Sequence, residues 1–317
     1  MQSPYSTAQL VSYLKSLALP PSYGRYIPAP WTFPQTEEAL TVLFRCQLTR
    51  YPYENLALHN SSSDPVSLEP DALYQRMLGA NDADPIGRGG YCLEVSIFFY
   101  YILRGLRSQV YMTGARNRDR QDGAPVGEFK GWVHIVNIVQ LPTGARLHLD
   151  AAFGGDGPTS PLPLISGHAV RNLGMQEVRL VLDSIPHQSR TDQKMWIYQY
   201  RNGPEKEWMS FYCFAELEWF PDDFEVINRF TSWEVRERGN VIAVRFLRSG
   251  EKGHYTRYCA PNAVDCAGAD EVRVVGKIMM VNHLLKINMG DRTQVIQEFD
   301  PKTQQAEILE KWFSISL

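Results

Sequence analysis

The chain contains no long hydrophobic run. A membrane-spanning helix needs about 20 consecutive apolar residues, whereas the longest run here, residues 95–103, includes Ser96 and ends at Arg104. At the N-terminus no basic segment is present, and Lys15 interrupts the apolar stretch 10–19, so a signal peptide is not expected. These absences predict no membrane partner.

Cysteine is also scarce, and neither positive nor negative charge dominates the composition. The five cysteines are odd in number and never spaced C-x-x-C, which argues against a disulfide framework and for the reducing cytoplasm. His254, Cys259 and Cys266 lack a fourth ligand, so no metal site is expected. A formal net charge of −3 predicts no nucleic acid partner. The sequence also has no glycine-rich phosphate loop of the Walker or Rossmann kind.

What is present is the composition of an ordinary globular protein. With 44% apolar and 21% charged residues, the 317-residue chain can bury a sizeable core. Apolar residues recur at helical spacing in the first hundred residues and alternate from about Gln109 onward. The predicted helices are 6–17 (capped by Ser6 and Gln9), 36–44, 71–78, 92–103 and 304–313. The predicted strands are 110–113, 132–139, 146–151, 178–182, 208–217, 241–246 and 272–278, and the charged segment 117–130 is predicted to be a mobile surface loop.

Cys92 stands out among the cysteines because of what surrounds it. A cysteine among apolar residues is usually a small core residue. Here two glycines and an arginine precede it, and a helix is predicted to begin at or beside it. The positive end of a helix dipole favours the reactive thiolate form of a cysteine. Cys92 is therefore a candidate nucleophile.

His134 and Asp150 are candidate partners of this thiol. Each lies eight positions from Pro142 in a predicted hairpin that turns at residues 142–144. Cross-strand neighbours have Cβ atoms about 5 Å apart, so we expect the Asp150 carboxylate to reach the His134 ring. Such a contact fixes the imidazole tautomer and stabilises the imidazolium, as in a catalytic triad. A Cys–His–Asp set fits covalent catalysis, and by spacing alone it fits a papain-like thiol hydrolase equally well.

Several short motifs resemble those of the arylamine N-acetyltransferases. Residues 88–94 read RGGYCLE and are similar to the RGGxCxE signature around the nucleophile of that family. Residues 51–56 (YPYENL) resemble the PFENL motif, residues 131–134 (GWVH) the histidine strand, and residues 150–154 (DAAFG) the aspartate segment D-x-G-F-G. Residues 164–167 and 223–228 also resemble family segments, so the resemblance runs from about residue 6 to the C-terminus.

The resemblance implies an α+β fold of three subdomains. These would be an N-terminal helical bundle over residues 1–107, a central β-barrel over 108–228 and a C-terminal α/β lid over 229–317. It also implies acyl transfer from an acyl-CoA co-substrate, without a tightly bound cofactor, through Cys92 to an aromatic amine or hydrazine by a ping-pong mechanism. Two rival readings stay open, a thiol hydrolase with the same triad and a binding module that has lost the chemistry.

Further roles follow from matching positions in the resemblance. Glu54 and Arg88 would support the nucleophile loop. The positions that match the acceptor pocket are Tyr53, Val133 and Phe153. Those that match the neighbourhood of bound coenzyme A are Gly131 and Tyr212.

Two departures bear on the pocket. Ala152 stands where a glycine is usual, and the sequence stops after residues 313–317 where some relatives continue into the active-site cleft, so a wider pocket is expected. In such a pocket, Arg116 either belongs to the solvated charged loop or points inward. If it points inward, its fork of donors would bind the carboxylate of a donor such as malonyl-CoA. Malonyl-CoA is therefore an alternative to acetyl-CoA as the preferred donor.

Overall fold

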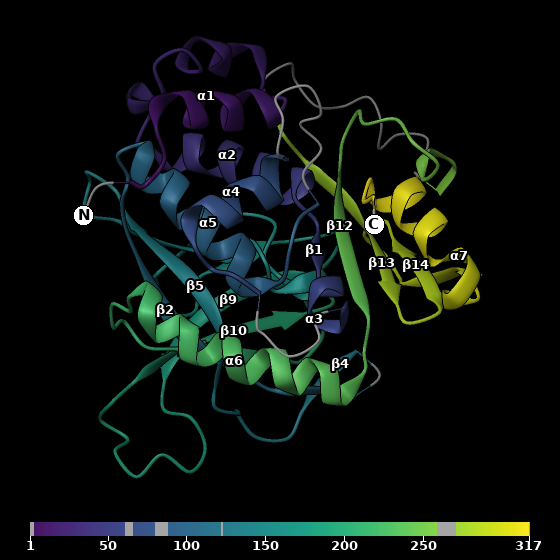
Figure 1. The fold of residues 1–317 in the computed structure, drawn as a ribbon. Coiled ribbons are helices and arrows are strands. Elements are labelled where there is room, and N and C mark those ends of the chain that lie inside the picture. Colours follow the sequence, from purple (N-terminus) through teal and green to yellow (C-terminus); the bar gives the residue numbers. More distant parts are fainter. Residues whose placement is uncertain (1–2, 61–65, 80–87, 122, 259–270, 317) are drawn as a thin grey trace.

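A computed structural model describes residues 3–60, 66–79, 88–121, 123–258 and 271–316 (Figure 1). Its first part is helical: α1 (Thr7–Ser16), α2 (Glu37–Arg50), α3 (Leu56–Asn60), α4 (Pro70–Leu78) and α5 (Cys92–Gly105), with the 3-10 turns η1 (Pro21–Tyr26) and η2 (Pro30–Thr32). Side-chain caps begin two of these helices, since Ser6 Oγ accepts a hydrogen bond from Gln9 N (3.3 Å) and Thr36 Oγ1 accepts one from Ala39 N (3.2 Å). The predicted helices in this part are confirmed.

An eight-stranded antiparallel sheet follows, with the order β7-β6-β5-β2-β11-β10-β9-β8. Its strands are β2 (Gln109–Asn117), β5 (Trp132–Gln140), β6 (Arg146–Leu149), β7 (Leu162–Pro163), β8 (Ala169–Arg171), β9 (Glu177–Asp183), β10 (Met195–Arg201) and β11 (Met209–Phe214). Contacts between β7 and β9 bring its two ends together into a nearly closed barrel. Helix α5 packs against β2 and β5, which places the start of α5 beside the barrel.

The second sheet joins a strand of the N-terminal helical part to four strands of the C-terminal part. Its order is β1-β12-β13-β14-β15, built from β1 (Tyr53–Glu54), β12 (Ile242–Arg248), β13 (Val274–Val281), β14 (Leu284–Asn288) and β15 (Gln294–Glu298). Helix α7 (Pro301–Ile308) and the π-helical turn η5 (Leu309–Phe313) cover this sheet, and α6 (Pro221–Arg238) runs along the lower front of the molecule (Figure 1). Two further 3-10 turns are η3 (Gly154–Asp156) and η4 (Thr256–Tyr258).

The fold class is α+β, as expected, but two details of the prediction need correction. The boundary placed between residues 228 and 229 falls inside α6, and β1 from the helical part pairs with β12, so the expected subdomains share elements. The charged segment 117–130 is not a plain loop, because β3 (Asp119–Gln121) and β4 (Ala124–Val126) pair there as a hairpin. No helix within the described residues is long and apolar enough to cross a membrane.

Candidate active site

Cys92 is the first residue of α5, and its loop is held from both sides. The backbone N of Gly90 donates to Pro52 O (3.3 Å), and Glu54 N donates to Gly90 O (2.9 Å). Gly89 has a φ of +88°, and a Cβ there would lie 2.2 Å from Pro52 O, so this position requires glycine. The thiol thus sits at the positive end of the helix dipole with 9% of the residue exposed.

His134 and Asp150 lie together, although not by the predicted register. Strands β5 and β6 pair Asn137 with Leu149, a register that would place Asp150 opposite Val136 rather than His134. The carboxylate, just past the end of β6, still reaches the ring, with Asp150 Oδ2 2.8 Å from His134 Nε2. The prediction of contact is confirmed, and the expected hairpin register was wrong by two residues.

Electrostatics favour a protonated His134 beside a charged Asp150. Burial lowers the pKa of His134, but the charge and hydrogen bond of Asp150, together with a hydrogen bond to Cys92, raise it to about 10. Burial raises the pKa of Asp150, yet His134 and the backbone N–H of Ala152 (3.2 Å from Oδ1) hold it below its ordinary value. Since Nε2 of the ring faces Asp150, Nδ1 is left for the thiol. The three groups therefore form a hydrogen-bonded chain.

Tyr212 does not lie where it was expected. It is fully buried in the barrel, and its hydroxyl lies 2.9 Å from His148 Nε2, behind Asp150. A ligand in the pocket cannot reach it, so the predicted contact of Tyr212 with coenzyme A was wrong. His148 is also fully buried, and burial lowers its pKa to about 4, so this ring is neutral at physiological pH.

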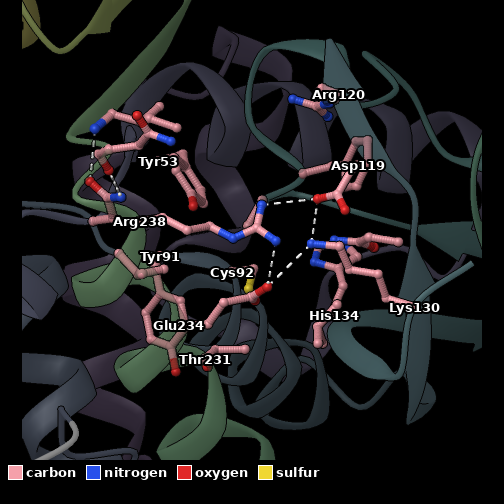
Figure 2. Close-up of a pocket in the computed structure, with 18 of the residues that line it drawn as sticks. Tyr53, Tyr91, Cys92, Asp119, Arg120, Lys130, His134, Thr231, Glu234 and Arg238 are labelled. Carbon is pink, nitrogen blue, oxygen red and sulfur yellow. Dashed lines mark hydrogen bonds and ion pairs between the residues drawn. The ribbon is translucent and has the colours of Figure 1, made fainter. Parts of the chain in front are cut away.

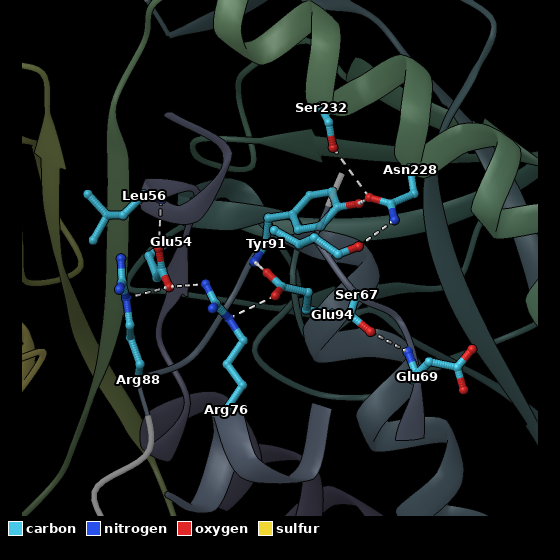
Figure 3. Close-up of polar contacts among 11 residues, drawn as sticks. Glu54, Leu56, Ser67, Glu69, Arg76, Arg88, Tyr91, Glu94, Asn228 and Ser232 are labelled. Carbon is cyan, nitrogen blue, oxygen red and sulfur yellow. Dashed lines mark hydrogen bonds and ion pairs between the residues drawn. The ribbon is translucent and has the colours of Figure 1, made fainter. Parts of the chain in front are cut away.

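A cluster of two buried carboxylates and two half-buried arginines supports the nucleophile loop (Figure 3). Arg88 Nε lies 3.1 Å from Glu54 Oε1, which is the ion pair expected from the sequence. Sequence reasoning missed Arg76, which bridges Glu54 Oε1 (2.9 Å) and Glu94 Oε1 (2.8 Å). Glu94 Oε2 in turn accepts from Tyr91 N (3.0 Å), so the cluster holds the residue before Cys92. The acidic residue in the first turn of α5 was the available signal.

Replacing Arg76 with methionine should destabilise the protein in a pH-dependent way. Burial raises the pKa of Glu94 to about 7, and Arg76 opposes that shift. Breaking a buried ion pair costs about 3 kcal/mol in free energy of unfolding. A raised carboxyl pKa destabilises the fold as pH rises from about 4.5 to 7, because the buried Glu94 then has to ionise. Above pH 7 the ionised Glu94 depends on Arg76, so the loss of stability in Arg76→Met should be greatest there. At pH 5 Glu94 is protonated, so the loss of stability should be smaller. Urea denaturation measures it, with the exposed Arg190→Met as control; equal losses at both pH values would contradict this account.

A cavity of about 310 Å³ opens beside Cys92 (Figure 2). Tyr53, Val133 and Phe153 line it, so the three residues expected beside the acceptor do come together around the thiol. Gly131 is exposed and does not itself line the cavity, although the preceding residue, Lys130, does. Its contact with coenzyme A stays a prediction.

Charged residues that sequence reasoning missed stand at the mouth of this cavity. In Figure 2, Asp119 and Lys130 face Glu234 and Arg238 of α6. Lys130 Nζ lies 2.5 Å from Asp119 Oδ1 and 3.2 Å from Glu234 Oε1. Arg238 lies 2.9 Å from each of the same two carboxylates. Only the four-residue spacing of Glu234 and Arg238 was visible in the sequence as a helical ion pair.

Arg116 does not line the cavity, so its predicted role was wrong. It lies on β2 with Nη1 donating to Lys130 O (2.9 Å), and its guanidinium carbon is 4.1 Å from the centre of the Trp132 ring. A bulge between Ala115 and Arg116 sets this direction. Nor is it a solvated loop residue, because it is half-buried within a strand.

The described residues contain no group of three or more side chains that could hold a metal ion. Cys259 and Cys266, considered above with His254, lie outside the described residues.

Comparisons with known proteins agree with this geometry. A family profile described as N-acetyltransferase matches residues 36–241, more than half of the chain. The chain is 26% identical to N-malonyltransferase FDB2 of Gibberella moniliformis over 337 residues, 99% of this chain and 90% of that protein. It is also 26% identical to arylamine N-acetyltransferase 2 of Homo sapiens over 293 aligned residues, which cover 88% of this chain and 88% of that protein.

Solved structures show the same fold. The arylamine N-acetyltransferase of Nocardia farcinica matches with a TM-score of 0.72 at 19% identity, over 99% of this chain and 93% of that one. Together with the family profile, these similarities settle the class of protein. The chain belongs to the arylamine N-acetyltransferase family, and it is an acyltransferase with an acyl-CoA as its co-substrate.

Proposed function

We propose that this enzyme carries the acyl group on Cys92, with His134 as its acid and base and Asp150 as the residue that orients the ring. The observation that supports this most directly is the hydrogen-bonded chain from the thiol through the ring to the carboxylate, at the floor of an open cavity. The ion pairs of Glu54 with Arg88 and Arg76 have an indirect role in this proposal, because they hold the loop that carries the nucleophile in place.

The steps of the reaction follow from the protonation states. The Cys92 thiolate attacks the thioester carbonyl carbon, and the tetrahedral intermediate collapses with loss of the CoA thiolate, which takes a proton from the His134 imidazolium. An amine then attacks the acyl-cysteine carbonyl. His134 accepts a proton from that nitrogen, and the Cys92 thiolate is restored as the amide leaves. The raised pKa of His134 suits the resting ion pair with the thiolate.

The acceptor in this proposal is an aromatic amine or hydrazine. Tyr53 and Phe153 supply aromatic rings, and Val133 an apolar side chain, to the lining of the cavity beside Cys92, which suits an aromatic substrate. Gly131 would leave room at the rim for the pantetheine arm, since a Cβ there would meet nothing within 4 Å. Cys46, Cys92 and Cys213 are free and buried, which supports the reducing cytoplasm as its compartment.

A malonyl donor is the second candidate, and the charges of the cavity favour it. The cavity is lined by four cations and two carboxylates, an excess of two positive charges: Arg118, Arg120, Lys130 and Arg238 against Asp119 and Glu234. The chain as a whole is negative, so this excess is local. The relative from Gibberella moniliformis is named an N-malonyltransferase and matches along nearly the whole chain.

Release of CoA should depend on the amine, which separates the proposed function from its two rivals. With acetyl-CoA alone, the enzyme should release about one equivalent of CoA and stop at the acyl-cysteine; an arylamine should restore continuous turnover. Thiol detection of free CoA measures both phases. Continuous release without amine would instead mark a thiol hydrolase, and no release a binding module.

A further inference from the structure

Three of the four cations that line the cavity are already engaged by other groups. Lys130 and Arg238 each contact both Asp119 and Glu234, at distances from 2.5 to 3.2 Å. Arg118 donates Nε (2.7 Å) and Nη1 (3.2 Å) to two backbone carbonyl oxygens. These side chains help to shape the mouth of the cavity, and a ligand anion would have to displace their present partners.

Arg120 is arranged differently. Its guanidinium carbon lies 4.7 Å from the ring centre of Phe153 and 4.9 Å from that of Phe211. Nη1 pairs with Asp156 Oδ2 at 3.1 Å, and within the described part of the chain no hydrogen bond involves Nε or Nη2. The side chain is 36% exposed and lines the cavity, so these donors are accessible to a ligand.

The carboxylate that holds Arg120 is shared with a second cation. Lys277 is buried on β13, and its Nζ lies 3.5 Å from Asp156 Oδ1 and also contacts Gly155 O. The two cations together hold the pKa of Asp156 below its ordinary value. Burial lowers the pKa of Lys277, and Asp156 opposes that shift. While Lys277 is protonated, one carboxylate faces two cations, and a positive charge remains beside the cavity. An anion on the open side of Arg120 would balance it.

The position of Arg120 points to the acyl group rather than to the CoA phosphates. The Phe153 ring is 5.1 Å from the ring of His134 on one side and 4.7 Å from the Arg120 guanidinium. Arg120 is thus separated from the catalytic histidine by a single aromatic ring. The anionic atoms nearest to the thioester in a donor are those of a terminal carboxylate on the acyl chain.

We infer that Arg120 is the specificity-determining residue for a dicarboxylic acyl group, binding the free carboxylate of malonyl-CoA while the thioester faces Cys92. This inference rests on the proposed function. A planar guanidinium whose Nε–Nη2 edge is free matches a carboxylate in a bidentate geometry. Asp156, itself held by Lys277, fixes the guanidinium beside the Phe153 ring before the donor binds, which reduces the entropy lost on binding.

The test compares two donors that differ only in the carboxylate. Arg120→Ala should lower kcat/KM for malonyl-CoA by roughly 10- to 100-fold, the effect expected for a charge-assisted hydrogen bond, and leave kcat/KM for acetyl-CoA within about threefold. Arg120→Lys keeps the charge and the pair with Asp156, and should recover part of the malonyl-CoA activity. Arg118→Ala removes a positive charge from the mouth of the cavity, and it should change kcat/KM for malonyl-CoA and for acetyl-CoA by the same factor.

Binding is read separately from turnover by protection of Cys92. Free malonate should slow iodoacetamide alkylation of Cys92 in the wild type and not in Arg120→Ala, whose folding is checked by its thermal transition. Equal losses with both donors, or no malonate protection in the wild type, would overturn the inference. If malonyl-CoA is not used while acetyl-CoA is, the inference fails and the proposed function stands. If neither donor acylates Cys92, the proposed function fails, and the malonate protection still decides whether Arg120 binds a carboxylate.

Discussion

Replacing Cys92 with serine should abolish acyl transfer while leaving the fold intact. Serine has nearly the same volume, but its hydroxyl stays protonated where a thiolate forms, so the His134 ring can no longer maintain an ion pair with the nucleophile. Intact-protein mass spectrometry after treatment with acetyl-CoA should show one added acetyl group in the wild type and none in the variant. Turnover should fall to the background rate.

The other buried cysteines provide the control for this experiment. Burial raises the pKa of Cys46 to about 11 and that of Cys213 to about 12, so neither thiol is a competing nucleophile at neutral pH. Cys46→Ala should therefore keep the acetyl adduct and the turnover of the wild type. An adduct that persists in Cys92→Ser, or turnover retained by it, would remove the covalent mechanism from consideration.

Replacing Asp150 with asparagine should reduce turnover by about three to four powers of ten, as the same change does in a well-studied serine protease triad. The amide can present an N–H to Nε2 of His134, which favours the wrong tautomer of the ring. It also removes the charge that raises the pKa of this buried histidine to about 10. Burial then dominates, and the imidazolium is lost at neutral pH.

Two measurements distinguish this effect from simple misfolding. Iodoacetamide alkylation of Cys92 should need a higher pH in Asp150→Asn, because the thiolate loses its cationic partner. In the wild type, the raised pKa of His134 stabilises the fold fully below about pH 6.5, and this contribution is lost as pH rises towards 10; the variant should lack that dependence. The exposed Asp183→Asn serves as control, and an unchanged alkylation profile in Asp150→Asn would show that Asp150 does not support the pair.

Local pattern was enough to predict much of this protein. The capping residues Ser6 and Thr36 mark helix starts, and the motif around Cys92 places the candidate nucleophile at the start of α5. The alternation of residues 132–139 places His134 on a strand. Such features depend on neighbours a few residues apart, which the sequence displays directly.

The register of strands β5 and β6 shows the limit of what local sequence pattern can predict. A shift of two residues leaves each side chain on the same face of a sheet, so alternation could not tell a partner at residue 134 from one at residue 136 for Asp150. The turn over residues 141–145 fixes that choice, since Leu141 N donates to Ala145 O (2.8 Å) and Gly144 N donates to Leu141 O (2.8 Å). Arg116 is a second case, because it follows a bulge in β2 and does not line the cavity.

The sequence by itself therefore determined the fold class, the family and the three groups proposed for catalysis, because short motifs and periodicity carry that information. The tertiary structure alone decided which other charges meet. Arg76 reaches Glu54 and Glu94 from another helix, and Arg120 shares Asp156 with Lys277 across more than a hundred residues. Ion pairs act over a few ångströms of space, and the packing of distant elements, which no local pattern encodes, sets those distances.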